Sequence, residues 1–341
     1  MNINKVMFFI VISLFSLISV AADIPAVSVK NISDNTIQGA YDNPANFHFV
    51  VMGDRTGKEQ KGVFGQVINK INLIRPAFVV SVGDAIDGYT DDPNLVNRQW
   101  DEFDSLVANL KVPFFAVPGN HDMVNDMMVQ IYQKRRHKTY FHALYKKVLF
   151  LFINTDDPSA AIDLQVRIEL DKEKKKLKEI ALQQGVTPQT IMLYKQFEQK
   201  ERDASGSKIS DAQFGYFKKV LADNNSVRWT FVVMHKPVWK QSTPPANWLE
   251  LEKILGSRPY TVFAGHEHVN SYTLRNNRDY IVMGTSGAGG LPDTLPGVYH
   301  HILWVTMDSN SPLIANLLAD GILEKTDIRS FSKDSIKAGS N

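Results

Sequence analysis

Residues 117–122 read Val117-Pro118-Gly119-Asn120-His121-Asp122, and the interpretation of the whole chain starts from them. The apolar run just before, residues 113–117, predicts a short buried strand that ends at Pro118-Gly119. Three side chains that can bind metal or move protons then follow in succession. A polar turn would have a similar composition, because Asn, Asp and Gly are frequent turn residues. The residues that follow the other predicted strands distinguish a polar turn from a functional site.

Four more predicted strands stop in the same manner. Apolar runs typical of buried strands occupy residues 47–52, 77–82, 229–234 and 260–264. The residues directly after them are Gly53-Asp54, Gly83-Asp84, His235 and Gly265-His266-Glu267-His268. Five strand ends therefore carry carboxylate, amide or imidazole groups.

The segments between these strands predict the fold class. Amphipathic patterns at residues 59–72 and 94–110 indicate helices between the first three strands. Strand, helix, strand, helix, strand implies an α/β core whose loops gather at one edge of a sheet. Further strands are predicted at residues 148–154, 280–283, 298–306 and 312–318, so the chain ends in β structure.

Composition limits the possible partners. The chain has 341 residues, 44% of them apolar, which is enough for a large core, and its formal net charge is only +2. This balance gives no indication of nucleic-acid binding as a primary role. There is no cysteine, which excludes disulfides and thiolate metal ligands.

The first 22 residues have the pattern of a cleaved signal peptide. Lys5 precedes an apolar stretch, residues 6–20, and Ala21-Ala22 supply small residues before Asp23. An uncleaved anchor is the alternative, but the apolar run is short for a membrane span. We therefore expect a periplasmic or secreted protein with no stable membrane span, a polar lead-in at residues 23–46, a main domain at 47–326 and a polar tail at 327–341.

A segment of different character interrupts the domain at about residues 160–207. It is rich in Lys, Glu, Gln and Leu, and it predicts two helices, 162–183 and 188–203. Thr187 is positioned to cap the second helix, with Pro188 at its first position. The insertion is interpreted either as a solvated helical hairpin or as a lid or docking arm for a protein partner beside the site.

The strand-end residues form a ligand set of oxygen and nitrogen donors. Such donors suit divalent Zn, Mn or Fe. Six ligands are too many for one tetrahedral ion and fit two ions that share a carboxylate. Two such ions form a clamp for displacement at phosphorus and hold a hydroxide between them. The candidate ligands are Asp54, Asp84, Asn120, His235, His266 and His268.

In these blocks and in their order, residues 47–318 resemble the calcineurin-like metallophosphoesterase superfamily, which includes purple acid phosphatases and bacterial phosphodiesterases. The resemblance implies a four-layer αββα sandwich of two β-sheets flanked by helices. It implies that Asp84 bridges two metal ions, that Asp54 and His268 hold one ion, and that Asn120, His235 and His266 hold the other. It also implies that His121 is the general acid for a bridging hydroxide nucleophile, with Asp122 orienting the His121 ring.

Arg55, Thr56 and Asp87 lie close in sequence to the candidate ligands. Many members of the superfamily have a metal-binding His where this chain has Thr56, and the purple acid phosphatases have a Tyr where it has Asp87. The first ion is therefore expected to have fewer protein ligands, and no iron–tyrosinate centre is expected. Asp87 is either an acceptor behind the ligands or a loop residue. Arg55 could contact a phosphate oxygen or form a salt bridge.

The sequence thus predicts an exported, dimetal-dependent hydrolase of small phosphoester substrates. It does not separate a phosphomonoesterase from a phosphodiesterase, because leaving-group recognition lies in variable loops. The alternative is a metal-binding interaction protein that turns over weakly or not at all. Thr56 and the helical insertion motivate that alternative.

Overall fold

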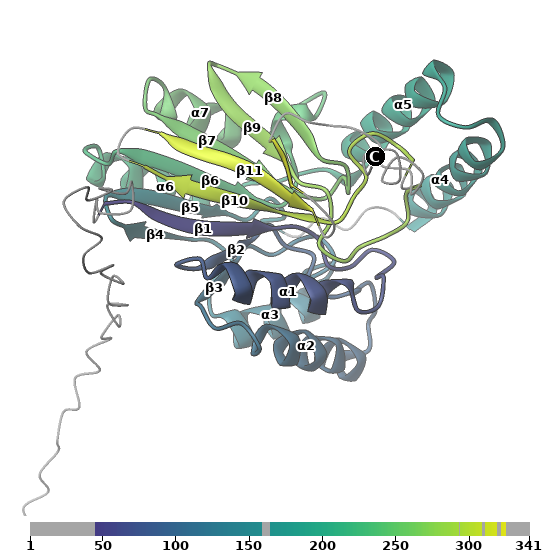
Figure 1. The fold of residues 1–341 in the computed structure, drawn as a ribbon, viewed down its shortest axis with the longest axis horizontal. Helices are drawn as coiled ribbons and strands as arrows, with labels where there is room; N and C mark the ends of the chain where they lie inside the picture. The colour runs from purple at the N-terminus through teal and green to yellow at the C-terminus, as the bar shows by residue number, and fades with distance from the viewer. Residues whose placement is uncertain (1–44, 159–163, 293, 309–310, 319–321, 325–341) are drawn as a thin grey trace, which may run out of the picture. The chain divides into compact units, whose positions relative to one another are not determined.

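The computed structural model describes residues 45–158, 164–292, 294–308, 311–318 and 322–324 (Figure 1). The predicted signal peptide, nearly all of the lead-in and the C-terminal tail lie outside these residues. No helix in the described ranges is long and apolar enough to cross a membrane.

The first of two sheets has six strands in the order β12-β11-β10-β1-β2-β3. The pairs β1/β2 and β2/β3 are parallel, and the other pairs are antiparallel. Its strands are β1 (Phe47–Met52), β2 (Val79–Ser81), β3 (Phe114–Ala116), β10 (His301–Met307), β11 (Pro312–Leu318) and β12 (Ile322–Glu324).

The second sheet also has six strands, in the order β4-β5-β6-β7-β9-β8. The central pairs β5/β6, β6/β7 and β7/β9 are parallel, and the two edge pairs are antiparallel. Its strands are β4 (Phe141–Tyr145), β5 (Val148–Ile153), β6 (Trp229–Met234), β7 (Tyr260–Ala264), β8 (Ser271–Arg275) and β9 (Arg278–Val282).

The main core lies between the sheets. Side chains alternate along β1, so Phe49 faces the second sheet while Val50 faces the helices of its own side. The Phe49 ring meets the rings of Phe150 and Phe231 edge to face, at centroid distances of 5.2 and 4.9 Å. This contact joins the two sheets face to face.

Helices cover the outer faces of both sheets (Figure 1). Buried residues of α1, α2 and α3 pack on the first sheet, and those of α6 and α7 pack on the second. The two-sheet sandwich flanked by helices, expected from the resemblance, is confirmed. The helices are α1 (Val63–Ile74), α2 (Pro93–Val107), α3 (Asp126–Arg136), α6 (Asp211–Asp223), α7 (Ala246–Leu255) and the 3-10 turn η1 (Val238–Lys240).

Two further helices, α4 (Leu164–Gln184) and α5 (Pro188–Ser205), occupy the predicted insertion. The Thr187 side chain accepts a hydrogen bond from the Thr190 backbone, and Pro188 is the first residue of α5, as the sequence predicts. The pair has a small apolar cluster of its own, which includes Phe197 and also Leu295 from a loop of the sandwich.

Five elements have no counterpart in the sequence prediction: α3, β4, β8, β12 and the turn η1. α3 buries few residues, chiefly Met128 and Tyr132, so its apolar periodicity is weak. β4 and β8 are edge strands that expose Leu144 and Leu274, and they lack the continuous apolar run of a central strand.

Candidate metal centre

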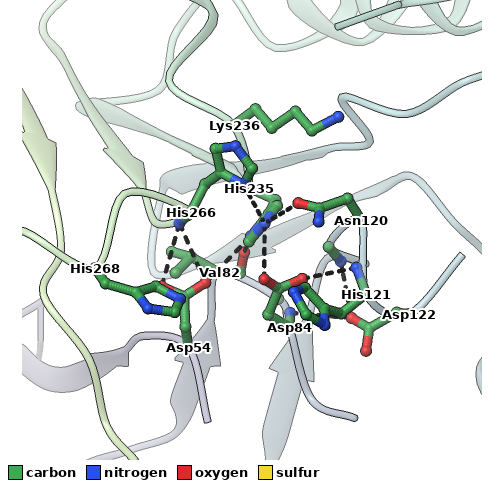
Figure 2. A network of polar contacts seen from close by, with 12 residues as sticks. Asp54, Val82, Asp84, Asn120, His121, Asp122, His235, Lys236, His266 and His268 are labelled. Carbon is green, nitrogen blue, oxygen red and sulfur yellow. Dashed lines mark hydrogen bonds and ion pairs between the residues drawn. The ribbon is translucent and has the colours of Figure 1, made fainter. Parts of the chain in front are cut away.

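The predicted ligands meet at the carboxyl ends of five strands. β1, β2 and β3 run parallel in one sheet, β6 and β7 run parallel in the other, and the loops that follow them converge (Figure 2). Parallel strands place their carboxyl ends at one edge, where α/β folds form sites. The structure brings together Asp54, Asp84, Asn120, His121, Asp122, His235, His266 and His268.

Glycines let these loops approach one another. A Cβ on Gly119 would overlap the Asp84 carboxylate, and one on Gly265 would lie 2.7 Å from Asp54 Oδ2. Three of the ligand residues have left-handed backbone, with φ of 56° at Asp84, 74° at His266 and 58° at His268. Such conformations are uncommon outside glycine and cluster at functional sites.

One group of donors surrounds the Nε2 atom of His235. Asp84 Oδ2 lies 3.3 Å from it, Asn120 Oδ1 lies 2.9 Å from it, and His266 Nδ1 lies 3.3 Å from it. The other ring nitrogen, Nδ1, lies 2.9 Å from the Val82 carbonyl oxygen, to which it can donate. That bond would leave Nε2 of His235 as a lone-pair donor toward the group.

A second group consists of Asp54, Asp84 and His268, whose candidate ligand atoms lie within 4.8 Å of one another. Both oxygens of Asp54 accept from the His266 backbone N–H, at 3.1 and 3.2 Å. His268 Nδ1 lies 3.3 Å from the Gly289 carbonyl oxygen. Asp84 belongs to both groups, as a bridging carboxylate must.

Burial opposes the ionisation of the Asp54 and Asp84 carboxyl groups at this centre. Burial, together with the charge of Asp84, raises the pKa of Asp54 to about 7, although His235 opposes the shift. Burial acts on Asp84 in the same sense, but the neighbouring histidines outweigh it and hold the pKa of Asp84 well below its usual range. Burial alone would lower the pKa of His235, whereas Asp84 and Asp54 raise it to about 9. Two buried carboxylates this close require positive charge beside them.

The other two histidines favour the neutral form that binds metal. Burial and the charge of His235 lower the pKa of His266 well below its ordinary value. Burial and the charge of Lys174 lower the pKa of His268 to about 3. The buried Nε2 of His266 has no hydrogen-bond partner among the described residues. Neutral imidazole nitrogens beside carboxylate and amide oxygens form a donor set that fits divalent metal ions.

His121 and Asp122 have different surroundings from those predicted. The Asp122 carboxylate accepts backbone N–H groups of Asp84, Ala85, Ile86 and Gly119, at 2.8–3.2 Å. The His121 Nδ1 atom lies 2.7 Å from the Asp87 carbonyl oxygen. The prediction that Asp122 orients the His121 ring therefore needs correction: the Asp87 backbone contacts the ring, and Asp122 fixes the loop that carries Asp84.

Thr56 and Asp87, the two residues that differ from the pattern expected from the resemblance, contact each other. The buried Thr56 hydroxyl donates to Asp87 Oδ1. Asp87 is a loop residue, one of the two roles expected for it, and the group that donates to its carboxylate is Thr56 and not one of the predicted ligands. Next to it, the Tyr89 hydroxyl accepts from Asn120 Nδ2 at 2.8 Å, and the Tyr89 ring meets His121 edge to face at 4.7 Å.

Arg55 is held in ion pairs. Its guanidinium lies 3.0 Å from Glu59, 2.7 Å from Glu102 and 3.1 Å from the Ala85 carbonyl oxygen. The side chain is 4% exposed and does not line the cleft that opens over the ligands. Of the two roles expected for Arg55, a phosphate contact and a salt bridge, the structure therefore supports the salt bridge.

A cleft of about 330 Å³ opens over the ligands, and the insertion forms part of its wall. Asp84, Asn120, His121, His266 and His268 line the cleft, and so do Leu170, Asp171 and Lys174 of α4 and Glu201 of α5. Sequence analysis missed Tyr89 and these insertion residues. Lys174 is one of several lysines in α4, and nothing in the local pattern distinguishes it.

Comparison with known proteins agrees with this geometry. A family model described as calcineurin-like phosphoesterase matches residues 47–270. No curated protein matches the chain significantly.

Solved structures share the fold at low identity. A dimetal phosphatase from Danio rerio is 14% identical, with a TM-score of 0.54, and the match covers 82% of this chain and 99% of that one. Plasmodium GAP50, described as the anchor in the inner membrane complex, is 15% identical over 85% and 90%, with a TM-score of 0.51. The purple acid phosphatase PPD1 from yellow lupin is 13% identical over 86% of this chain and 55% of that one, with a TM-score of 0.52.

Proposed function

The chain belongs to the calcineurin-like phosphoesterase family and is a metal-dependent phosphoester hydrolase, and we propose that it works as an exported enzyme with a dinuclear centre on Asp84. The observation that carries the proposal is the sharing of Asp84 between two donor groups, Asp84–His235–His266 and Asp54–Asp84–His268. Asn120 Oδ1, 2.9 Å from His235 Nε2, adds a donor to the first group.

These residues would hold two divalent ions, which we propose to be Mn, Zn or Fe from the oxygen and nitrogen donors. Bound there, the ions would supply charge stabilisation at the phosphoryl oxygens and lower the pKa of water. The chain's own contribution is to fix the donors. Backbone N–H groups hold Asp54 and Asp122, and carbonyl oxygens lie beside Nδ1 of His235 and of His268.

His121 is the proposed general acid. With Nδ1 donating to the Asp87 carbonyl oxygen, a charged His121 carries its second proton on Nε2, available to a leaving-group oxygen. The residue lines the cleft together with Tyr89 and Asn120. Proton donation matters most when the leaving group is a poor one, such as an alkoxide.

Export remains a proposal from the first 22 residues. N-terminal sequencing of the protein expressed in its full-length form tests it. A mature chain that begins at Asp23 in the extracytoplasmic fraction is expected. Recovery of an uncleaved chain in the membrane fraction would support the anchor instead.

The reaction is tested by hydrolysis of a chromogenic phosphomonoester and a phosphodiester. The metal-stripped mature chain is re-supplied separately with Mn, Zn, Fe and Ca. We expect a transition metal to restore turnover and Asp84→Asn to abolish it, and the ratio of the two rates to identify the preferred ester.

An interaction protein on the same fold is the second candidate. Thr56 in place of a metal-binding histidine favours it, and GAP50 is described as an anchor. Two ions bound per chain without turnover of any ester would favour this candidate over the hydrolase.

A further inference from the structure

The insertion places charged groups on the cleft that holds the metal ligands. Three residues of α4, Leu170, Asp171 and Lys174, and Glu201 of α5 line it. The cleft volume of about 330 Å³ lies in the range of small-molecule sites and exceeds what a phosphoryl group alone needs. The insertion is therefore in a position to contact a substrate.

A bound phosphoryl group carries negative charge on its non-bridging oxygens, so a cation beside the proposed metal ions would bind it through charge-assisted hydrogen bonds. Arg55 does not supply it, since Glu59 and Glu102 occupy its guanidinium. Histidines apart, the cationic side chains lining the cleft within the described residues are Lys58 and Lys174. Lys58 is an exposed residue of the loop after Asp54.

Lys174 is the better positioned of the two lysines. Its Nζ atom lies 3.4 Å from Glu201 Oε1 and 5.9 Å from the centre of the Phe197 ring, and its side chain is only 23% exposed. These contacts tie the ammonium group to α5 at the cleft.

We propose that Lys174 binds a non-bridging phosphoryl oxygen of the substrate, so that the α4–α5 insertion completes the phosphate site. This inference rests on the proposed function, because it places the phosphoryl group at the metal centre. Glu201 is a positioning residue that holds the ammonium group and competes with phosphate for it.

Binding of inorganic phosphate tests the proposal independently of turnover. Calorimetry on the Mn-loaded chain compares wild type, Lys174→Ala and Glu201→Gln. Lys176→Ala is the matched control, because Lys176 is an exposed lysine of the same helix that does not line the cleft. Metal content is measured for every variant.

We expect Lys174→Ala to weaken phosphate binding by roughly 10-fold, the usual effect of removing a charged hydrogen-bond donor. Lys176→Ala should bind as wild type does. Glu201→Gln should bind phosphate at least as tightly as wild type, since it removes the competing carboxylate. A purely structural ion pair predicts the opposite, namely equal losses in Lys174→Ala and Glu201→Gln.

Three results would overturn the inference: unchanged phosphate binding in Lys174→Ala at equal metal content, equal losses in both ion-pair variants, or no phosphate binding by wild type. Failure of the proposed function gives a different result. In that case no ester is hydrolysed, while phosphate binding still depends on Lys174.

Discussion

The two walls of the cleft are built differently. On the strand-end wall, Asp84 is almost completely buried, as are the neighbouring Asp54 and His235, which do not line the cleft, and hydrogen bonds hold their side chains or loops. The insertion wall carries Lys174 and Glu201 on helices with partly exposed side chains. We infer that the strand ends hold the metal ligands in fixed positions, whereas the helices of the insertion can adjust their contacts with a substrate.

The ion pairs between α4 and α5 contribute little to the free energy of unfolding, as is usual for exposed pairs. The Lys200–Glu173 pair is 2.6 Å long, but its side chains are 62% and 39% exposed. Exposed pairs of this kind contribute about 0–1 kcal/mol each. The insertion can therefore vary its charges without disturbing the sandwich, so we expect it to affect substrate binding rather than the chemical step.

The largest effect is expected for Asp84→Asn, which removes the carboxylate shared by both donor groups. Turnover should fall by at least roughly 10³-fold for every ester, because even one electrostatic contact in a transition state is worth 10²–10³. Steady-state kinetics with metal analysis measures it. Asp126→Asn, an exposed acid on α3, is the control. Near-normal activity with two ions bound would show that the centre lies elsewhere.

The next largest effect on activity is expected for His121→Ala. We expect kcat for an alkyl phosphate to fall about 10²-fold, and kcat for a nitrophenyl ester to fall less, because nitrophenolate leaves without a proton. Metal content should not change. His137→Ala serves as the control at an exposed histidine. A rise in KM with unchanged kcat would assign His121 to binding instead of proton transfer.

A third prediction concerns the support behind the strand-end wall. His301 lies 2.8 Å from the Gly284 N–H and 2.7 Å from Asn316 Oδ1, and burial lowers its pKa from 6.5 to about 4. The neutral ring is thus favoured in the folded state. The neutral ring makes its full contribution to the free energy of unfolding above pH 6.5. This contribution, about 3 kcal/mol in total, is lost as the pH falls toward 4.

Urea unfolding of the metal-stripped chain at pH 7.5 and 4 measures this loss. His301→Gln should lose about 3 kcal/mol less between these two values than wild type does, although it starts from lower stability. His137→Gln, at an exposed site, should follow wild type. Identical losses in His301→Gln and wild type would assign the acid sensitivity to the other buried histidines.

The strand-end wall could be predicted from sequence because its signals are local. Each ligand follows an apolar run, and a glycine precedes Asp54, Asp84, Asn120 and His266 where a Cβ would collide. The central strands were predictable for the same reason. The edge strands β4 and β8 were not, because polar residues such as His142 and Thr273 interrupt the apolar run.

Contacts between distant segments could not be predicted. Nothing near Arg55 indicates that Glu102 neutralises it, and nothing near His121 indicates that the Asp87 carbonyl oxygen contacts its ring. Lys174 belongs to a lysine-rich helix whose members differ only in which face of the helix they occupy. The face that meets the cleft depends on how α4 packs against Leu295 and its neighbours, which is a tertiary property.

The smallest effect is expected for Asp203→Ala, at the attachment of α5 to the sandwich. Asp203 Oδ1 accepts from the Ser242 N–H at 3.0 Å, and Oδ2 accepts from the Ser242 hydroxyl at 2.8 Å. Because Asp203 is exposed, its loss should change the free energy of unfolding by less than about 1 kcal/mol. A less firmly attached insertion should raise KM by roughly 3-fold and leave kcat unchanged.

Steady-state kinetics and hydrogen exchange of α4–α5 measure both effects, with Glu179→Ala on the exposed face of α4 as the control. A fall in kcat at constant KM would mean that the insertion takes part in the chemical step, and the division of labour between the two walls would then be wrong.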